Sequence, residues 1–306
     1  MVNRYYIDCQ KIVSTVDPGA PISLYINPDE EEKKYLVDSC LIDEHTLHSA
    51  LDPDEQARLE WEPNHVALIY KRPKNYSGEK ELLFKAATIG LFIFKDRIII
   101  VMNEDTNLLE GKPLAKVSTL NEVILKLFYR SIYHFMQHLR IINMIADEIE
   151  DKINKAMENK FLINLFSLQK SLVYYQNAIT SNGVLLGKIK NSAVKFNFKQ
   201  DEMELLDDIL IENNQCYRQA EVYSNILASL MDARASIVNN NLNILMKTLN
   251  IITITIMMPT FVVSVFSMNV PLPAGLNHLT LAFWIILGLA GISMVSFFLF
   301  WKFKKW

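Results

Sequence analysis

A row of small, polar and methionine side chains recurs at alternating steps of four and three residues in the C-terminal third of the sequence. Its members are Asn225, Ser229, Asp232, Ser236, Asn239, Asn243, Met246, Asn250, Thr253, Met257, Thr260, Ser264 and Ser267. A mean spacing of 3.5 residues places side chains on one face of an α-helix, where a helical bundle has its seam. Neutral oxygens there can replace part of a cation's water shell, or hold a hydrated cation through its waters. Mg²⁺ gives up water reluctantly, which favours the second contact.

Two interpretations of this row remain open. Serine and threonine let membrane helices approach closely and hydrogen-bond, so the part of the row within 248–268 is explained by helix packing alone. The row, however, continues for six positions before the membrane, where a bundle in water would have leucine and isoleucine. The whole row therefore favours the wall of a water-filled channel.

The two apolar segments near the C-terminus, described below, are each long enough to span a membrane. One chain with two spans cannot enclose a pore, so we expect several copies around a symmetry axis. Met246, Leu249 and Met257 are candidates for rings that gate by dewetting. The residues predicted to line the pore are Asp232, Asn239, Asn243, Met246, Leu249, Asn250, Thr253, Met257, Thr260 and Ser264.

The elements that must position this row include two apolar segments near the C-terminus. Residues 279–301 are 23 positions without a charge and 248–268 are also uncharged, and about 20 apolar residues span a bilayer. Pro259 is compatible with a membrane helix, because neighbouring helices can satisfy the freed backbone groups. We therefore expect a multi-pass protein of the cell (inner or plasma) membrane, with the bilayer as a partner.

The charges around the two spans predict an orientation. The intervening loop, 269–278, has no lysine, whereas Lys302, Lys304 and Lys305 follow the second span in the tail, 302–306. Basic residues accumulate on the cytoplasmic side, so the tail is expected there. With two spans, the N-terminal body is then cytoplasmic too.

The body preceding the spans has an α+β part and a helical part. Residues 1–117 are expected to form a mixed α/β domain, with helices after Pro28 (29–42) and after Pro53. Its strand-like runs are 22–27, 65–70, 82–94 and 97–103, the last two forming a hairpin. Residues 118–200 are expected to contain long helices over 119–160 and 162–182, possible partners in an antiparallel pair. Residues 201–267 contain no glycine and one proline, which predicts a helix of about 100 Å at 1.5 Å per residue, its stalk being 201–247.

Other motifs point away from enzymes and nucleic-acid binding. The net charge is −3, and an acidic body argues against nucleic acid as a partner. The sequence has no phosphate-binding loop, dinucleotide fingerprint, GxSxG or CxxC, so no catalytic residue and no cofactor is expected. His134 and His138 have the spacing of zinc ligands on a helix, but they lack the HExxH pattern and are interpreted as structural. The acidic run that begins at Asp201 is either a cation-attracting or sensing surface, or a solvated helix start.

The C-terminal segments resemble the CorA family of divalent cation channels. The mark of that family is a Gly-Met-Asn triplet at the end of the first of two C-terminal spans, and this sequence has Ser267, Met268 and Asn269 there. Residues 243–269 are similar to the family's pore helix, and Asp232 falls where the family has an aspartate on the pore axis. Residues 52–70 and 89–103 look like its α/β domain. The resemblance thus extends over essentially the whole chain.

The resemblance implies a funnel-shaped homopentamer that conducts Mg²⁺, with Co²⁺ and Ni²⁺ as analogues. It implies that Ser267, Met268 and Asn269 form the selectivity filter, with Asn269 holding the hydrated ion at the outer mouth. It also implies that the cytoplasmic domains sense Mg²⁺, and Asp208 falls where a sensor aspartate would lie. Mg²⁺ would then be both substrate and regulatory ligand.

Two departures from the family pattern leave the ion open. Ser267 replaces the glycine, and the loop lacks the acidic residue that most members have. If glycine serves a positive φ there, Ser267 is either strained by about 1–3 kcal/mol or the filter has another local shape. The alternatives are a zinc transporter of the ZntB type and a non-conducting membrane sensor or scaffold.

Overall fold

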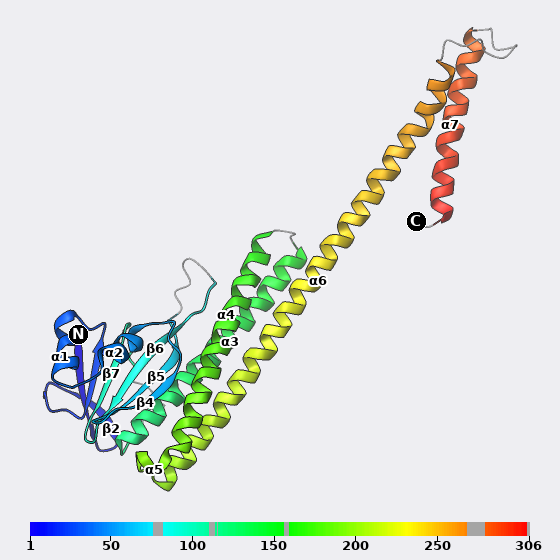
Figure 1. Cartoon of the computed structure of the whole chain (residues 1–306). Helices are drawn as coiled ribbons and strands as arrows, with labels where there is room; N and C mark the ends of the chain where they lie inside the picture. The colour runs from blue at the N-terminus through cyan, green and yellow to red at the C-terminus, as the bar shows by residue number, and fades with distance from the viewer. Residues whose placement is uncertain (76–81, 110–113, 115, 156–158, 268–278, 305–306) are drawn as a thin grey trace. The chain divides into compact units, whose positions relative to one another are not determined.

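The structure is a computed structural model that describes residues 1–75, 82–109, 114, 116–155, 159–267 and 279–304 (Figure 1). The chain divides into two compact units, Met1–Met231 and Asp232–Trp306. The first unit contains a β-sheet and several helices. The second contains the C-terminal part of α6 (Gln200–Phe266) and α7 (Leu279–Lys304). Each unit is treated by itself below.

A mixed sheet of seven described strands forms the centre of the first unit. The strands are β1 (Val2–Asp8), β2 (Lys11–Thr15), β3 (Ile22–Ile26), β4 (Arg58–Trp61), β5 (Val66–Pro73), β6 (Ala86–Ile93) and β7 (Ile98–Met102). Their spatial order is β2-β1-β3-β7-β6-β5-β4, and β3 pairs with β7 in parallel while the other pairs are antiparallel. The predicted β6–β7 hairpin is confirmed, with Ile93 opposite Ile98.

Helices cover both faces of this sheet. On one face, Ile69 and Val101 pack with α1 (Glu30–Asp38) and α2 (Glu44–Leu51). On the other, Tyr70 and Ile100 belong to the core shared with α3 (Leu120–Lys155) and α4 (Asn159–Asn191). Both faces are buried, which explains why the central strands are almost continuously apolar.

Capping interactions set the bounds of the short helices. At α1, Asp29 and Glu32 form a reciprocal capping box, as the acidic first turn indicated. The helix ends at Asp38, earlier than predicted, because Leu41 takes φ 58° and the Ile42 N–H donates back to Leu36 O at 3.1 Å.

The helix predicted after Pro53 is wrong. The Asp43 carboxylate accepts the Thr46 N–H at 2.9 Å and starts α2 earlier, so that Pro53 follows the helix instead of opening it. Strands β1, β2 and β4 were not predicted. The run 82–94 becomes strand only from Ala86, because the Phe84 N–H donates to a serine on α4.

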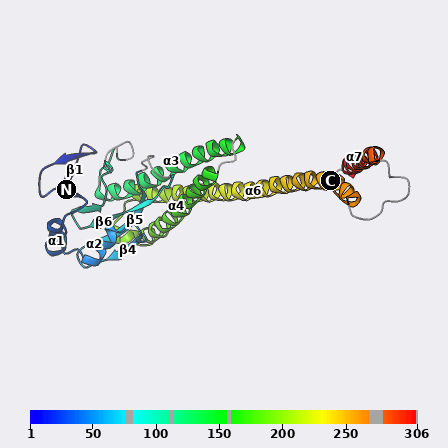
Figure 2. The same cartoon turned by 90° about the horizontal axis from the view of Figure 1, so that it is seen from above.

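Long helices complete the chain. α3 has 36 residues, α4 has 33, and the two lie side by side and antiparallel in both views (Figures 1 and 2). α4 extends beyond the predicted 162–182, and a short α5 (Ala193–Phe196) follows it. The uninterrupted helix predicted over 201–267 is confirmed as α6, with 67 residues and Pro259 inside it. α6 and α7 are both long and apolar enough to cross a membrane.

Polar side chains of α4 complete the hydrogen bonding of the sheet. β4 pairs with β5 only from Val66 to Ile69, and Lys71 lies beyond its end. There the Lys71 N–H donates to Asn182 Oδ1 and Asn182 Nδ2 donates to Lys71 O, both at 2.8 Å. In the same way Ser181 accepts the Ala57 N–H at 2.7 Å. The Asn182 amide therefore replaces a missing strand neighbour, which buried backbone groups require.

Replacing Asn182 by alanine is expected to lower the free energy of unfolding by about 1–3 kcal/mol, because both Lys71 backbone groups lose a partner while buried. Asn177, exposed on the same helix, provides the matched control, Asn177→Ala. Urea denaturation of the full chain in detergent measures both. Equal shifts for the two variants would contradict this role for Asn182.

Candidate functional site

One face of α6 packs within the first unit. Its buried residues follow alternating steps of four and three, and they are Glu202, Leu206, Ile209, Asn213, Cys216, Ala220 and Leu227. Most of the apolar ones belong to the core that α3 and α4 share with the sheet. The Asn213 amide donates to Ile179 O on α4 at 3.1 Å. These contacts fix how α6 is rotated about its own axis.

The polar row lies on the opposite face of α6. Asn225, Ser229 and Asp232 each follow a packing residue by two positions, which is about 200° around a helix with 3.6 residues per turn; those packing residues are Tyr223, Leu227 and Leu230. In the first unit, Leu227 is 2% exposed while Asn225 and Ser229 on either side are exposed. All thirteen members of the row, including the predicted pore-lining ones, are exposed, as is Leu249.

The pattern is weaker within the second unit. There Ile251, Thr255, Pro259, Val262 and Phe266 are half-buried, at steps of four, four, three and four. A hollow beside Phe297 and Trp301 of α7 is lined by Ile251 and also by two members of the row, Asn250 and Thr253. The face opposite the packing residues is therefore identified within the first unit.

The hydroxyl groups of the row act as acceptors. Ser229 donates to Asn225 O at 2.9 Å, Thr253 to Leu249 O at 2.9 Å and Thr260 to Ile256 O at 2.7 Å. A hydroxyl whose proton is bound to its own helix offers only oxygen lone pairs outward. The waters around a cation point their O–H groups outward, and these O–H groups can donate to such lone pairs. These hydroxyl groups can therefore accept hydrogen bonds from the waters of a hydrated cation.

The predicted filter is described only at Ser267. Its N–H donates to Val263 O at 3.1 Å and its hydroxyl to Ser264 O at 2.9 Å. Ser267 is not among the non-glycine residues with positive φ, so the strain considered for this position is absent and the local shape is a final helical turn. Met268, Asn269, the loop 269–278 and the tail residue Lys305 lie outside the described residues.

The acidic start of α6 divides between structural and exposed carboxylates. Glu202 is buried, accepting from Thr119 Oγ1 at 2.6 Å and from the Lys199 N–H at 2.9 Å. Asp207 pairs with Lys190 at 2.7 Å, and Asp208 is exposed. Among the described residues of one chain, no three His, Cys, Asp or Glu side chains are grouped to hold a metal. A sensor site at Asp208 stays a prediction, and it requires ligands from a second chain.

The histidine pair on α3 has structural contacts. His138 Nδ1 lies 2.6 Å from the Tyr175 hydroxyl of α4, and the rings of His134 and His138 are 4.4 Å apart. Burial lowers the pKa of each histidine to about 4. Both rings are therefore neutral at pH 7. His138 joins α3 to α4, while His134 lies against His138 and lines the cavity between α3 and the sheet.

Comparisons with known proteins agree with this architecture. The family model described as CorA-like Mg²⁺ transporter protein matches residues 24–305. A curated relative is the cobalt/magnesium transport protein CorA of Methanocaldococcus jannaschii. It is 25% identical over 297 residues, which are 92% of this chain and 89% of the relative.

Two solved structures share the fold. The CorA magnesium transporter of Methanocaldococcus jannaschii matches with a TM-score of 0.83 at 17% identity, over 99% of this chain and 97% of that one. The ZntB cytoplasmic domain of Vibrio parahaemolyticus matches with a TM-score of 0.62 at 11% identity, over 78% and 98%. The predicted fold class, an α+β domain followed by a very long helix and a C-terminal apolar helix, is confirmed.

Cysteine labelling tests which face of α6 meets water. In a chain with Cys9→Ser, Thr253→Cys and Thr260→Cys should react quickly with a charged thiol reagent. Thr255→Cys and Val262→Cys, on the half-buried face, should react slowly and serve as controls. Equal rates on the two faces would contradict the assignment of the row to an aqueous surface.

Proposed function

The chain belongs to the CorA-like Mg²⁺ transporter family, and from this premise we propose that it transports divalent cations, Mg²⁺ first, through a pore lined by α6. The observation that carries the proposal is the position of the polar row. Within the first unit it lies opposite the packing face, where it is free to line a shared axis.

A pore of this kind requires several copies of the chain, and we propose a homopentamer in the cell membrane. The most apolar window of α6 is 0% buried within one chain, so other copies or lipid must cover it. Row residues such as Thr260 would face the axis, while Ile256 and Phe261, 62% and 68% exposed, would contact lipid or α7 of a neighbour. Both termini would be cytoplasmic, in line with the basic tail.

Selection of the ion is assigned to contacts with its water shell. Asn269 at the outer mouth would accept hydrogen bonds from the waters bound directly to the ion. Deeper in the pore, the hydroxyl groups of the row would accept hydrogen bonds from the same waters. Such contacts suit Mg²⁺, which keeps its waters. Mg²⁺ bound near Asp208 between subunits would regulate opening.

Zinc transport of the ZntB type is the second candidate, and Ser267 favours it. Its hydroxyl, repeated in every subunit, adds a ring of oxygens at the end of the pore helix. Such a ring could exchange with a water of the ion and favour a partly dehydrated transition metal over fully hydrated Mg²⁺.

Asn269→Ala is expected to lower Mg²⁺ flux into liposomes by about tenfold or more, because a hydrogen bond to a charged group contributes about 1.5–3 kcal/mol. Asn214→Ala, at an exposed asparagine near the start of α6, is the control for assembly and handling. Unchanged flux in Asn269→Ala would place selection elsewhere. Absence of flux in the unmodified protein would favour a non-conducting sensor.

Ser267→Gly is expected to raise the ratio of Mg²⁺ to Zn²⁺ flux, because it removes the added hydroxyl ring while leaving the loop neutral. Parallel flux assays with Mg²⁺, Zn²⁺ and Co²⁺ measure this ratio. If the ratio stays where it was, Ser267 does not set the selectivity and the uncharged loop becomes the cause to test.

A further inference from the structure

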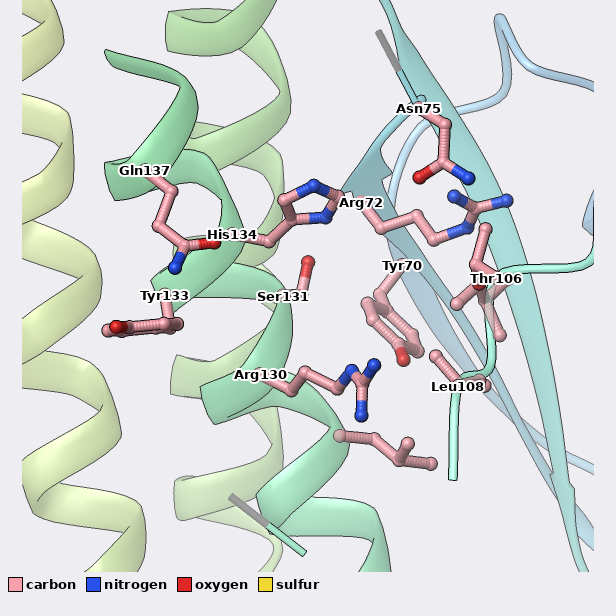
Figure 3. A pocket seen from close by; sticks show the side chains of 12 residues that line it. Tyr70, Arg72, Asn75, Thr106, Leu108, Arg130, Ser131, Tyr133, His134 and Gln137 are labelled. Carbon is pink, nitrogen blue, oxygen red and sulfur yellow. The ribbon is translucent and has the colours of Figure 1, made fainter. Parts of the chain in front are cut away.

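A cavity with several polar side chains in its lining lies between the sheet and α3, within the first unit and away from the row on α6. Its volume is about 330 Å³, at the lower end of the range for small-molecule sites, about 300–1,000 Å³. In Figure 3, Tyr70 and Arg72 of β5 and Thr106 line one side, and Arg130 and His134 of α3 line the other. Tyr133 and Gln137 on α3 are exposed at its rim.

Arg72 is built into the wall of this cavity. It is 3% exposed, and its guanidinium donates to Pro73 O at 3.0 Å and to Glu104 O at 3.5 Å. Its Nε is buried with no hydrogen-bond partner among the described residues. A buried guanidinium is costly unless its donors are paired. A guanidinium has five N–H donors, and two of them serve Pro73 O and Glu104 O, so the Nε–H and a neighbouring Nη–H remain for a ligand.

Other unsatisfied groups converge on the same space. The Tyr70 hydroxyl and Thr106 Oγ1 are also buried without a hydrogen-bond partner among the described residues. Both can donate a proton. Ordered water can satisfy single groups of this kind, but three of them around one cavity form a site with several donors.

The charged groups of the described lining are two guanidinium groups. They belong to Arg72 and Arg130, and no Asp or Glu is among the described lining residues. Glu104, behind Arg72, lies 3.9 Å from its Nη2 and is shared with Lys74. The same charges act on His134, whose pKa is lowered to about 4 by burial first and then by Arg72 and Arg130.

We propose that this cavity binds a small phosphate-bearing anion, with Arg72 and Arg130 holding the phosphate from the sheet and from α3. Arginine is the residue best shaped for phosphate oxygens, which it contacts through two parallel N–H groups. The Tyr70 and Thr106 hydroxyls complete the donor set. The remaining volume accommodates a small organic body, so both inorganic phosphate and a phosphate monoester fit the chemistry. The proposal concerns the first unit and does not depend on transport.

Isothermal titration calorimetry on the full chain in detergent tests the site. The probes are inorganic phosphate, glycerol 3-phosphate and adenosine monophosphate, with chloride at equal ionic strength as the reference anion. Saturable binding of a phosphate probe, at least about tenfold weaker in Arg130→Gln, is expected. Tighter binding of a monoester than of inorganic phosphate identifies a metabolite as the ligand, and the reverse identifies free phosphate.

Arg140→Gln, an exposed arginine on α3 outside the lining, controls for the loss of one positive charge and should leave binding unchanged. Arg72→Lys keeps the buried charge but removes the paired N–H geometry, and it should also weaken binding about tenfold or more. The melting temperature of each variant, measured without ligand, establishes that the variant is folded. If Arg130→Gln is not folded, Arg130→Lys takes its place. Absence of saturable binding, equal affinity for chloride, or unchanged affinity in both Arg130 and Arg72 variants would overturn the proposal.

Discussion

The rotation of α6 about its own axis is the constraint on which the functional surface depends. Seven buried positions between Glu202 and Leu227 hold one face of this helix against the rest of the first unit. Within that unit, fixing one face of the helix decides which side chains point the opposite way. Polar residues are tolerated on that opposite face only if water or a partner contacts them. The core of the first unit thus determines that Asn225 and Ser229 point away from it.

Polar side chains have different hydrogen-bonding roles along α6 and in the cavity. Along α6, serine and threonine give their protons to the helix backbone and present oxygen, which accepts from hydrated cations. In the cavity between β5 and α3, Arg72 and Arg130 present only donors. The proposed cation surface and the proposed anion site thus differ in their hydrogen-bonding character. In both, backbone carbonyl groups occupy some of the donors, as for Thr253 and Arg72.

The long elements could be predicted from the sequence because each depends on a local rule. The absence of glycine and the single proline predicted the long helix α6, and the alternating steps of four and three predicted its polar face. The length of the apolar segment 279–301 predicted α7. The elements that were missed depend on distant contacts. β1 is half-exposed and polar, and it becomes a strand by pairing with β2 and β3. The start of α2 depends on one cap at Asp43. The cavity could not be predicted from the sequence, because Arg72 and Arg130 come to line one space only once α3 packs on the sheet.

The bridge between Asn182 and Lys71 has a consequence for the order in which the protein is made. The two residues are 111 positions apart, and ribosomes add about 5–20 residues per second. The sheet is fully translated at Met102, yet the backbone of β5 lacks this partner for roughly 5–20 s. During that interval the Lys71 N–H lacks its partner from α4. Asn182 is translated before residue 248, so this bridge can form before the first apolar segment is made.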